Sequence, residues 1–220
     1  MTHKYPLIAA GVAAALSGAY AQATAPTIAQ AAAATQTLVI AGSSAAKNAI
    51  ISGVETDVCG GSGNVLLVSS AGGTKNFFAL ACNTTATISG ITTGSLVTIY
   101  YRTEGGSVVG ALPIATGYHP LRLNLSDASC TGSGLTATCT VNGTTSANGP
   151  NDSWTGAVTP DAVQLGITDL EPGLLTGADY PTGYNAGVWG SASTAQMKAL
   201  TSVRLIQQVF GLAVNNSGGG

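Results

Sequence analysis

Three short stretches of this sequence place a hydroxyl or a carboxylate directly after an apolar, strand-like run. Ser43 and Ser44 follow the first run, Ser107 follows the second run and a pair of glycines, and Asp169 ends the third. A polar side chain between a strand and the start of a helix lies beside backbone amides that have no partner within the helix. These residue types therefore indicate a site for a small anion, if the fold brings the three stretches together.

The stretch Thr98–Gly110 has the fullest pattern of the three. Its first residues, Ile99–Tyr101, are β-branched or aromatic and predict a strand, which breaks at Gly105-Gly106. Ser107 then suits the first turn of a helix, and we expect it to cap that helix. Glycines let the backbone approach a ligand closely, and the helix dipole favours negative charge at this end. Gly106 and Ser107 are thus candidate anion ligands.

The other two stretches follow the same order of elements. Thr37–Ala41 is a continuous apolar run that predicts a buried strand before Ser43 and Ser44, which are either helix N-caps or anion ligands. Capping and anion binding use the same geometry, so both roles can hold. Ala162–Asp169 alternates apolar residues along a third strand that ends in Thr168 and Asp169.

The remaining pattern alternates strands with helices, which predicts an α/β fold with a mostly parallel sheet. Further strands are expected at Asn64–Ser69, Phe77–Cys82, Val97–Arg102 and Val203–Val214, and helices at 45–54 and Ser191–Leu200. In such sheets ligands bind beyond the carboxyl ends of the strands, which is where the three polar stretches fall.

The segment His119–Thr159 is the least regular part of the chain. Leu121–Leu125 and Leu135–Val141 alternate apolar and polar residues and predict a two-stranded excursion, whereas Asn142–Thr155 predicts a loop. Four cysteines allow three disulfide pairings. We expect the pairing that closes the short loop between Cys130 and Cys139, which leaves Cys59 to pair with Cys82, and each bridge should add roughly 2–4 kcal/mol of stability.

The N-terminus resembles a secretory signal peptide in residues 1–23. A short basic segment precedes the apolar run Pro6–Gly18, which is too short to span a bilayer, and Ala19-Tyr20-Ala21 fits a cleavage site. An N-terminal membrane anchor is the alternative. We expect a flexible leader at 24–36, one lobe at 37–214 with an insertion at about 119–159, and a glycine-rich tail at 215–220. The signal and the cysteines together predict a periplasmic or secreted protein.

Composition and motifs exclude several functions. A net charge of −2, with only 7% charged residues, offers no basic surface for nucleic acid. No Cys-x-x-Cys pair supports a zinc site, and His119 is the one histidine left after cleavage of the signal peptide. No Gly-x-Ser-x-Gly nucleophile motif occurs, so an enzyme is not expected and no cofactor is implied.

At the three polar stretches the chain resembles the periplasmic phosphate-binding proteins of ABC-type transporters, which have the type 2 periplasmic-binding fold. Ala41–Ser44 is similar to the family's first phosphate loop, whose hydroxyl and following amide touch the anion. Ile99–Gly110 is similar to the second ligand segment. Leu165–Leu170 is similar to the third, a hydrophobic-Gly-Ala-Ser-Asp stretch. The resemblance spans about Leu38 to Val214.

The resemblance implies phosphate or a similar oxyanion as the ligand and membrane transporter subunits as partners. By it, the ligand-binding residues are Ser43, Ser44, Ala45, Gly106, Ser107, Thr168 and Asp169. The aspartate would accept a hydrogen bond from protonated phosphate. The family's second lobe has no counterpart here, so the resemblance implies the first lobe of a truncated chain.

The sequence leaves a second function open, that of an extracellular structural or adhesive protein with the same fold and no ligand. The surface rich in Thr, Ser, Asn and Gly, the insertion and the carboxylate of Glu104 beside the second turn all favour it.

Overall fold

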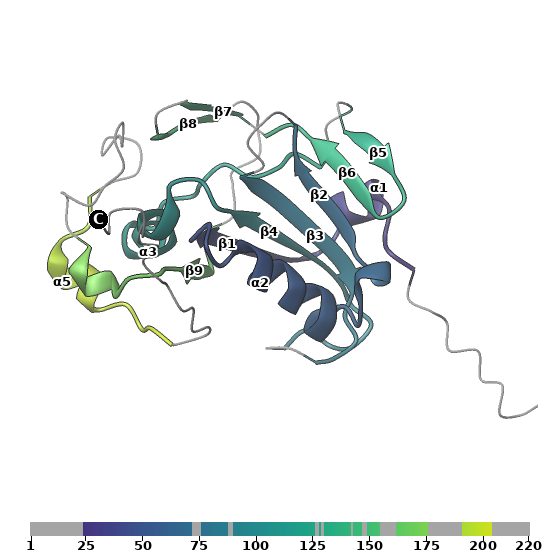
Figure 1. Cartoon of the computed structure of the whole chain (residues 1–220), viewed down its shortest axis with the longest axis horizontal. Helices are drawn as coiled ribbons and strands as arrows, with labels where there is room; N and C mark the ends of the chain where they lie inside the picture. Colours follow the sequence, from purple (N-terminus) through teal and green to yellow (C-terminus); the bar gives the residue numbers. More distant parts are fainter. Residues whose placement is uncertain are drawn as a thin grey trace, which may run out of the picture.

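The computed structural model describes residues 24–71, 76–87, 90–125, 128, 130–141, 143–146, 149–154, 162–175 and 191–203, with only the backbone described in 143–146 and 149–154 (Figure 1). The predicted signal peptide, the glycine-rich tail and nearly all of the predicted strand Val203–Val214 lie outside the described residues.

The centre of the molecule is a mixed sheet of seven strands in the order β5-β6-β2-β3-β4-β1-β9. The strands are β1 (Gln36–Gly42), β2 (Leu66–Ser70), β3 (Phe77–Asn83), β4 (Leu96–Arg102), β5 (Thr131–Ser133), β6 (Thr136–Cys139) and β9 (Leu165–Ile167). The α/β class is confirmed. The prediction of a mostly parallel sheet is wrong, because three of the six pairings are antiparallel.

The antiparallel pairings follow from the connections between neighbouring strands. A parallel pair needs a crossover of a dozen or more residues, usually with a helix. Only residues 71–76 join β2 to β3, and the described part of the longer link from β3 to β4 contains turns. Long connections with helices lead instead to the parallel pairs of β1 with β4 and β9.

Helices lie on both faces of the sheet, as an α/β fold requires. They are α1 (Ile28–Ala32), α2 (Lys47–Gly53), α3 (Gly106–Thr116) and α5 (Thr194–Lys198), with a π-helical turn η1 (Val54–Val58) and 3₁₀ turns η2 (Ser62–Asn64) and η3 (Pro172–Leu174). Ser193 caps α5 through a capping box with Gln196.

The stretch expected to be a flexible leader contains α1, which packs against the sheet. Thr27 caps this short helix, and Ala31 is only 1% exposed. The Thr98 hydroxyl on β4 donates to the Ala31 carbonyl oxygen at 2.8 Å. The prediction fails here because the anchoring contacts come from a strand 67 residues away.

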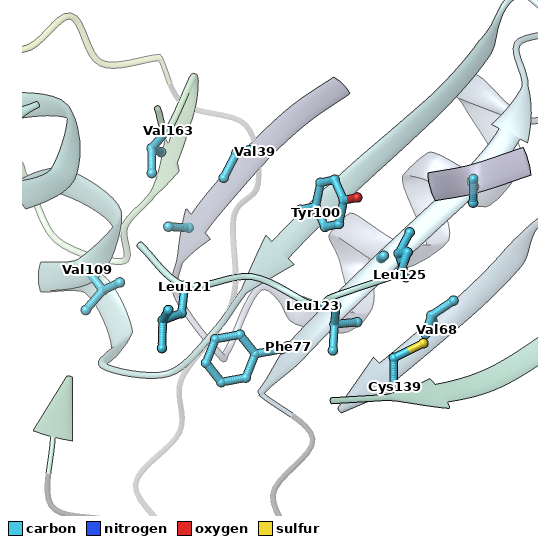
Figure 2. Packing of buried hydrophobic residues seen from close by; sticks show 14 of the residues in the cluster. Val39, Val68, Phe77, Tyr100, Val109, Leu121, Leu123, Leu125, Cys139 and Val163 are labelled. Atoms are coloured by element: carbon cyan, nitrogen blue, oxygen red, sulfur yellow. The ribbon is translucent and has the colours of Figure 1, made fainter. Parts of the chain in front are cut away.

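Alternating residues of the strands bury both faces of the sheet. On one face, Figure 2 shows Leu121, Leu123 and Leu125 on an extended segment that crosses over Phe77 and Tyr100. Side chains of α1, α3 and α5 join the same cluster. On the other face α2 covers a second cluster, which includes residues such as Ile40, Phe78 and Tyr101.

Both disulfides of the chain form as expected, Cys59 with Cys82 and Cys130 with Cys139. The second closes the β5–β6 hairpin, which is part of the main sheet because β6 pairs with β2. The predicted strand at Leu121–Leu125 is wrong, because β6 pairs with β5 and this segment meets the chain beyond β6 at an isolated bridge between Leu123 and Val141. The predicted loop Asn142–Thr155 contains a second hairpin, β7 (Gly143–Ser146) and β8 (Gly149–Trp154).

Candidate functional site

The three polar stretches follow neighbouring parallel strands. β1 lies between β4 and β9, with Ala41 opposite Arg102 and Gly42 opposite Ile167 (Figure 1). Because the three strands run in the same direction, their carboxyl ends meet at one edge of the sheet. The residues that follow each strand therefore start from the same place, as the sequence predicts.

Ser107 and Asp169 are in direct contact at this edge. The Asp169 amide donates to Ser107 Oγ at 3.1 Å, across 62 residues of sequence. Ser107 is half-buried and Asp169 is exposed. A serine hydroxyl that accepts one hydrogen bond still has its proton to donate. The contact therefore places a hydroxyl donor beside an exposed carboxylate.

Ser107 does not cap α3, which corrects the prediction. Gly105 is the N-cap, with a φ of 86°, and no side chain caps the helix. Gly105 and Gly106 begin the helix, so Ser107 lies inside its first turn and not at the N-cap. The Ser107 side chain instead contacts the Asp169 amide, just after β9. The N-terminal amides of α3 are not covered by a side-chain cap, which favours an anion at this end.

Ser43 is used differently. It is fully buried, and its Oγ accepts hydrogen bonds from the amides of Ala45 at 3.2 Å and Ala46 at 3.3 Å. Its own amide donates to the Ile167 carbonyl at 2.8 Å. Ser43 therefore holds the turn that leads into α2, but it does not cap the helix, because Ala46 is the N-cap and no side chain bonds there. The predicted N-cap role of Ser43 or Ser44 is wrong.

The other candidate ligands surround these two serines. Ser44 and Ala45 are exposed on the loop before α2, and Gly106 is half-buried at the start of α3. Thr168 Oγ1 donates to the Leu170 carbonyl at 2.7 Å and accepts from the Leu170 amide at 3.1 Å. Thr168 therefore shapes the turn that presents Asp169.

Tyr101 lies under the candidate site and contacts the loop after β1. Its sequence pattern indicates only a place on a strand. Its side chain is buried on β4, and its hydroxyl donates to the Ser43 carbonyl at 2.6 Å. Burial, and then the nearby charge of Asp169, raise the pKa of the phenol above its ordinary value of 10.0. The phenol therefore stays neutral and keeps this hydrogen bond at physiological pH.

The charge of Glu104, which the sequence places beside the Gly-Gly-Ser turn, is balanced by an ion pair. Arg102 Nη2 lies 2.8 Å from Glu104 Oε2, and the arginine side chain is only 2% exposed. The guanidinium also lies 4.9 Å from the ring centre of Phe77. An anion near Ser107 would therefore meet a neutralised pair rather than a lone carboxylate.

A groove of about 1010 Å³ lies beside β9 and takes in Thr168 and Asp169. Ile114, Leu165, Leu170 and Val203 also line it, and each of these side chains is at least 37% exposed. The candidate site therefore opens toward a partly apolar surface.

No three His, Cys, Asp or Glu side chains of the described part of the chain come close enough together to hold a metal ion. The helices of this part include none with the length and apolarity to cross a membrane.

No family model, curated protein or solved structure matches this chain. Its candidate site is defined by the sequence and the geometry described above.

Proposed function

We propose that this chain is an exported solute-binding lobe that holds phosphate or a similar small oxyanion where β1, β4 and β9 end. The resemblance to periplasmic phosphate-binding proteins motivates this proposal. The observation that carries it is the hydrogen bond between the Asp169 amide and Ser107 Oγ, because it joins two of the three predicted ligand stretches.

Ser107 and the first amides of α3 are the proposed donors to the anion. They lie at a helix end with no side-chain cap, next to an ion pair that neutralises Glu104. Ser44 is the proposed ligand from the loop after β1, since its side chain is exposed there, whereas the Ala45 amide already donates to Ser43 Oγ. Ser43 supports this loop through its hydrogen bonds to the Ala45 and Ala46 amides.

Asp169 is the proposed specificity residue. A carboxylate repels an anion unless the anion brings a proton to share, as phosphate does near neutral pH. Sulfate carries no such proton, so we expect it to bind more weakly than phosphate.

Export and transport complete the proposal. The two disulfides are compatible with an extracellular protein. We propose that the signal peptide directs the chain to the periplasm or outside the cell, and that ABC-type membrane subunits receive the ligand.

Calorimetry with inorganic phosphate tests the binding site. Hydrogen bonds to a charged ligand contribute about 1.5–3 kcal/mol, so Ser107→Ala and Asp169→Ala should each weaken binding by roughly tenfold to a hundredfold. Ser133→Ala, on the exposed strand β5, is the matched control and should bind as the wild type does. Unchanged phosphate affinity in both site variants would rule the assignment out.

The alternative, an extracellular structural or adhesive protein without a ligand, is favoured by the threonine-rich hairpin at the far edge of the sheet. All of β5 is exposed, and Thr131 and Thr138 hydroxyls lie 2.9 Å apart. Thermal melting separates the two functions. Phosphate at about 100 times its Kd should stabilise a receptor by about 2.7 kcal/mol and should leave a protein without a site unchanged.

A further inference from the structure

Three glycines lie where β1, β9 and α3 meet, and none of them leaves room for a side chain. A Cβ added to Gly166 would overlap the carbonyl oxygen of Gly110, and a Cβ on Gly110 or Gly42 would overlap the carbonyl oxygen of Ile167. Gly42 also needs its φ of +130°, which disfavours other residues. At Gly110 and Gly166 the requirement is space alone.

The contact between Gly110 and Gly166 lets α3 lie with its backbone against β9, as Figure 1 shows for the two elements. This glycine contact also lies close to the candidate site. Gly110 comes one helical turn after Ser107, and Gly166 comes three residues before Asp169. The glycine contact is therefore between α3 and β9, and the Ser107–Asp169 hydrogen bond is between α3 and the turn that directly follows β9.

A side chain between the two elements would separate them at the site as well. Real Cβ atoms almost never come within 3.0 Å of another heavy atom, so an alanine at Gly166 would push α3 away from β9 by on the order of 1 Å. The hydrogen bond to Ser107 is 3.1 Å long. An increase of that size would take it beyond hydrogen-bond distance.

We propose that Gly110 and Gly166 are positioning residues for the oxyanion site. Their backbone contact holds the Ser107 hydroxyl beside the Asp169 amide, and so fixes the donors on α3 relative to the carboxylate on the β9 side. For its ligand this inference rests on the proposed function. The contact on which the glycines act is a hydrogen bond within the chain.

The test uses Gly166→Ala and Gly110→Ala in the full chain, with Gly53→Ala as the matched control. Gly53 is also a helical glycine, but a Cβ there meets nothing within 4 Å. Two quantities are measured: hydrogen exchange of the Asp169 amide by NMR, and the affinity for inorganic phosphate by calorimetry. Both site variants should speed exchange of that amide and weaken phosphate binding by roughly tenfold or more, and the control should change neither.

A double variant shows whether the glycines act through the serine. In a Ser107→Ala background the Asp169 contact is already lost, so adding Gly166→Ala should weaken phosphate binding little further. A purely structural role would instead give an additive loss of affinity.

The outcomes separate this inference from the proposed function. A folded Gly166→Ala protein with unchanged Asp169 exchange overturns the positioning role, whatever it binds. Faster exchange in a protein whose wild type does not bind phosphate supports the positioning role and removes the proposed ligand. If neither variant folds, hydrogen exchange of the wild-type protein gives the test. The free energy of local opening should be the same for the Asp169 amide and the Gly110 amide, because one contact holds both. An Asp169 amide that is not protected from exchange overturns the inference.

Discussion

Two loops of this protein have nearly the same sequence pattern, a strand, glycine, serine and helix start, yet they use their serines in opposite ways. Ser43 is fully buried and accepts hydrogen bonds from the amides of Ala45 and Ala46, in the turn just after it. Ser107 is half-buried and accepts a hydrogen bond from the amide of Asp169, which is 62 residues away in the sequence. A shared local pattern therefore does not fix a shared role.

The difference comes from the surroundings of each loop. Ser43 lies on the loop after the central strand β1, between the Ile167 carbonyl and the Tyr101 hydroxyl, so its side chain is enclosed. Ser107 follows two glycines with positive φ, which start α3 before the serine. Ser43 thus supports the first loop, whereas Ser107 belongs to the candidate site.

The stability of the segment after β1 should depend strongly on the disulfide between Cys59 and Cys82. Cys59 ends the helical segment that begins with α2 and is bonded to Cys82 on β3, 23 residues later. Replacing both cysteines by alanine should cost about 3 kcal/mol of stability in urea denaturation. Phosphate affinity should fall at most by the contribution of one ligand, roughly tenfold to a hundredfold, because only Ser44 of the proposed ligand side chains lies on this loop. A larger loss would show that the two loops are not separate.

Ser43→Ala should be the next most damaging change. It removes the acceptor of the Ala45 and Ala46 amides, and loss of a hydrogen bond to a buried amide such as that of Ala46 costs about 1–2 kcal/mol. Urea denaturation measures the loss. Ser44→Ala, one residue along on the exposed side, is the control and should change stability by less than about 0.5 kcal/mol.

Tyr101→Phe should cost about 1 kcal/mol at neutral pH, because it removes one hydrogen bond to the Ser43 carbonyl. The substitution should also change the alkaline behaviour. The folded state raises the pKa of this phenol, so its contribution to stability is full below about pH 10 and is lost as the pH rises further. Denaturation at neutral and alkaline pH should show a shallower decline in the variant; identical slopes would contradict it.

Ser107→Ala should have the smallest effect on stability, about 0.5 kcal/mol or less, since the side chain is half-buried and its partner Asp169 is exposed. Thermal unfolding without phosphate measures this. A loss as large as that of Ser43→Ala would mean that both serines are structural.

Much of this fold follows from local pattern. The apolar runs predict β1, β3 and β4 closely, because buried strands need continuous apolar residues. Convergence of Ser107 and Asp169 follows from one rule, that parallel strands end at the same edge. The direction of β3 could not be predicted from its residues, since pairing direction depends on the connections.

The remaining differences depend on distant contacts. The burial of Ser43 depends on Tyr101 and Ile167, which no local pattern joins to it. Gly110 within an apolar helix and Gly166 within an apolar strand did carry a signal, because an isolated glycine in such a pattern marks a close backbone approach. That signal would have indicated the contact between α3 and β9.

The most direct test of the central claim is a phosphate titration of the isotope-labelled protein followed by the NMR shifts of individual amides. We expect saturable shifts of the Ser107, Val108 and Asp169 amides. These should exceed any shift of the Ala46 amide, because that amide already donates a hydrogen bond to Ser43 Oγ. No saturable shift at Ser107 and Asp169, or the largest shift at Ala46, would contradict it.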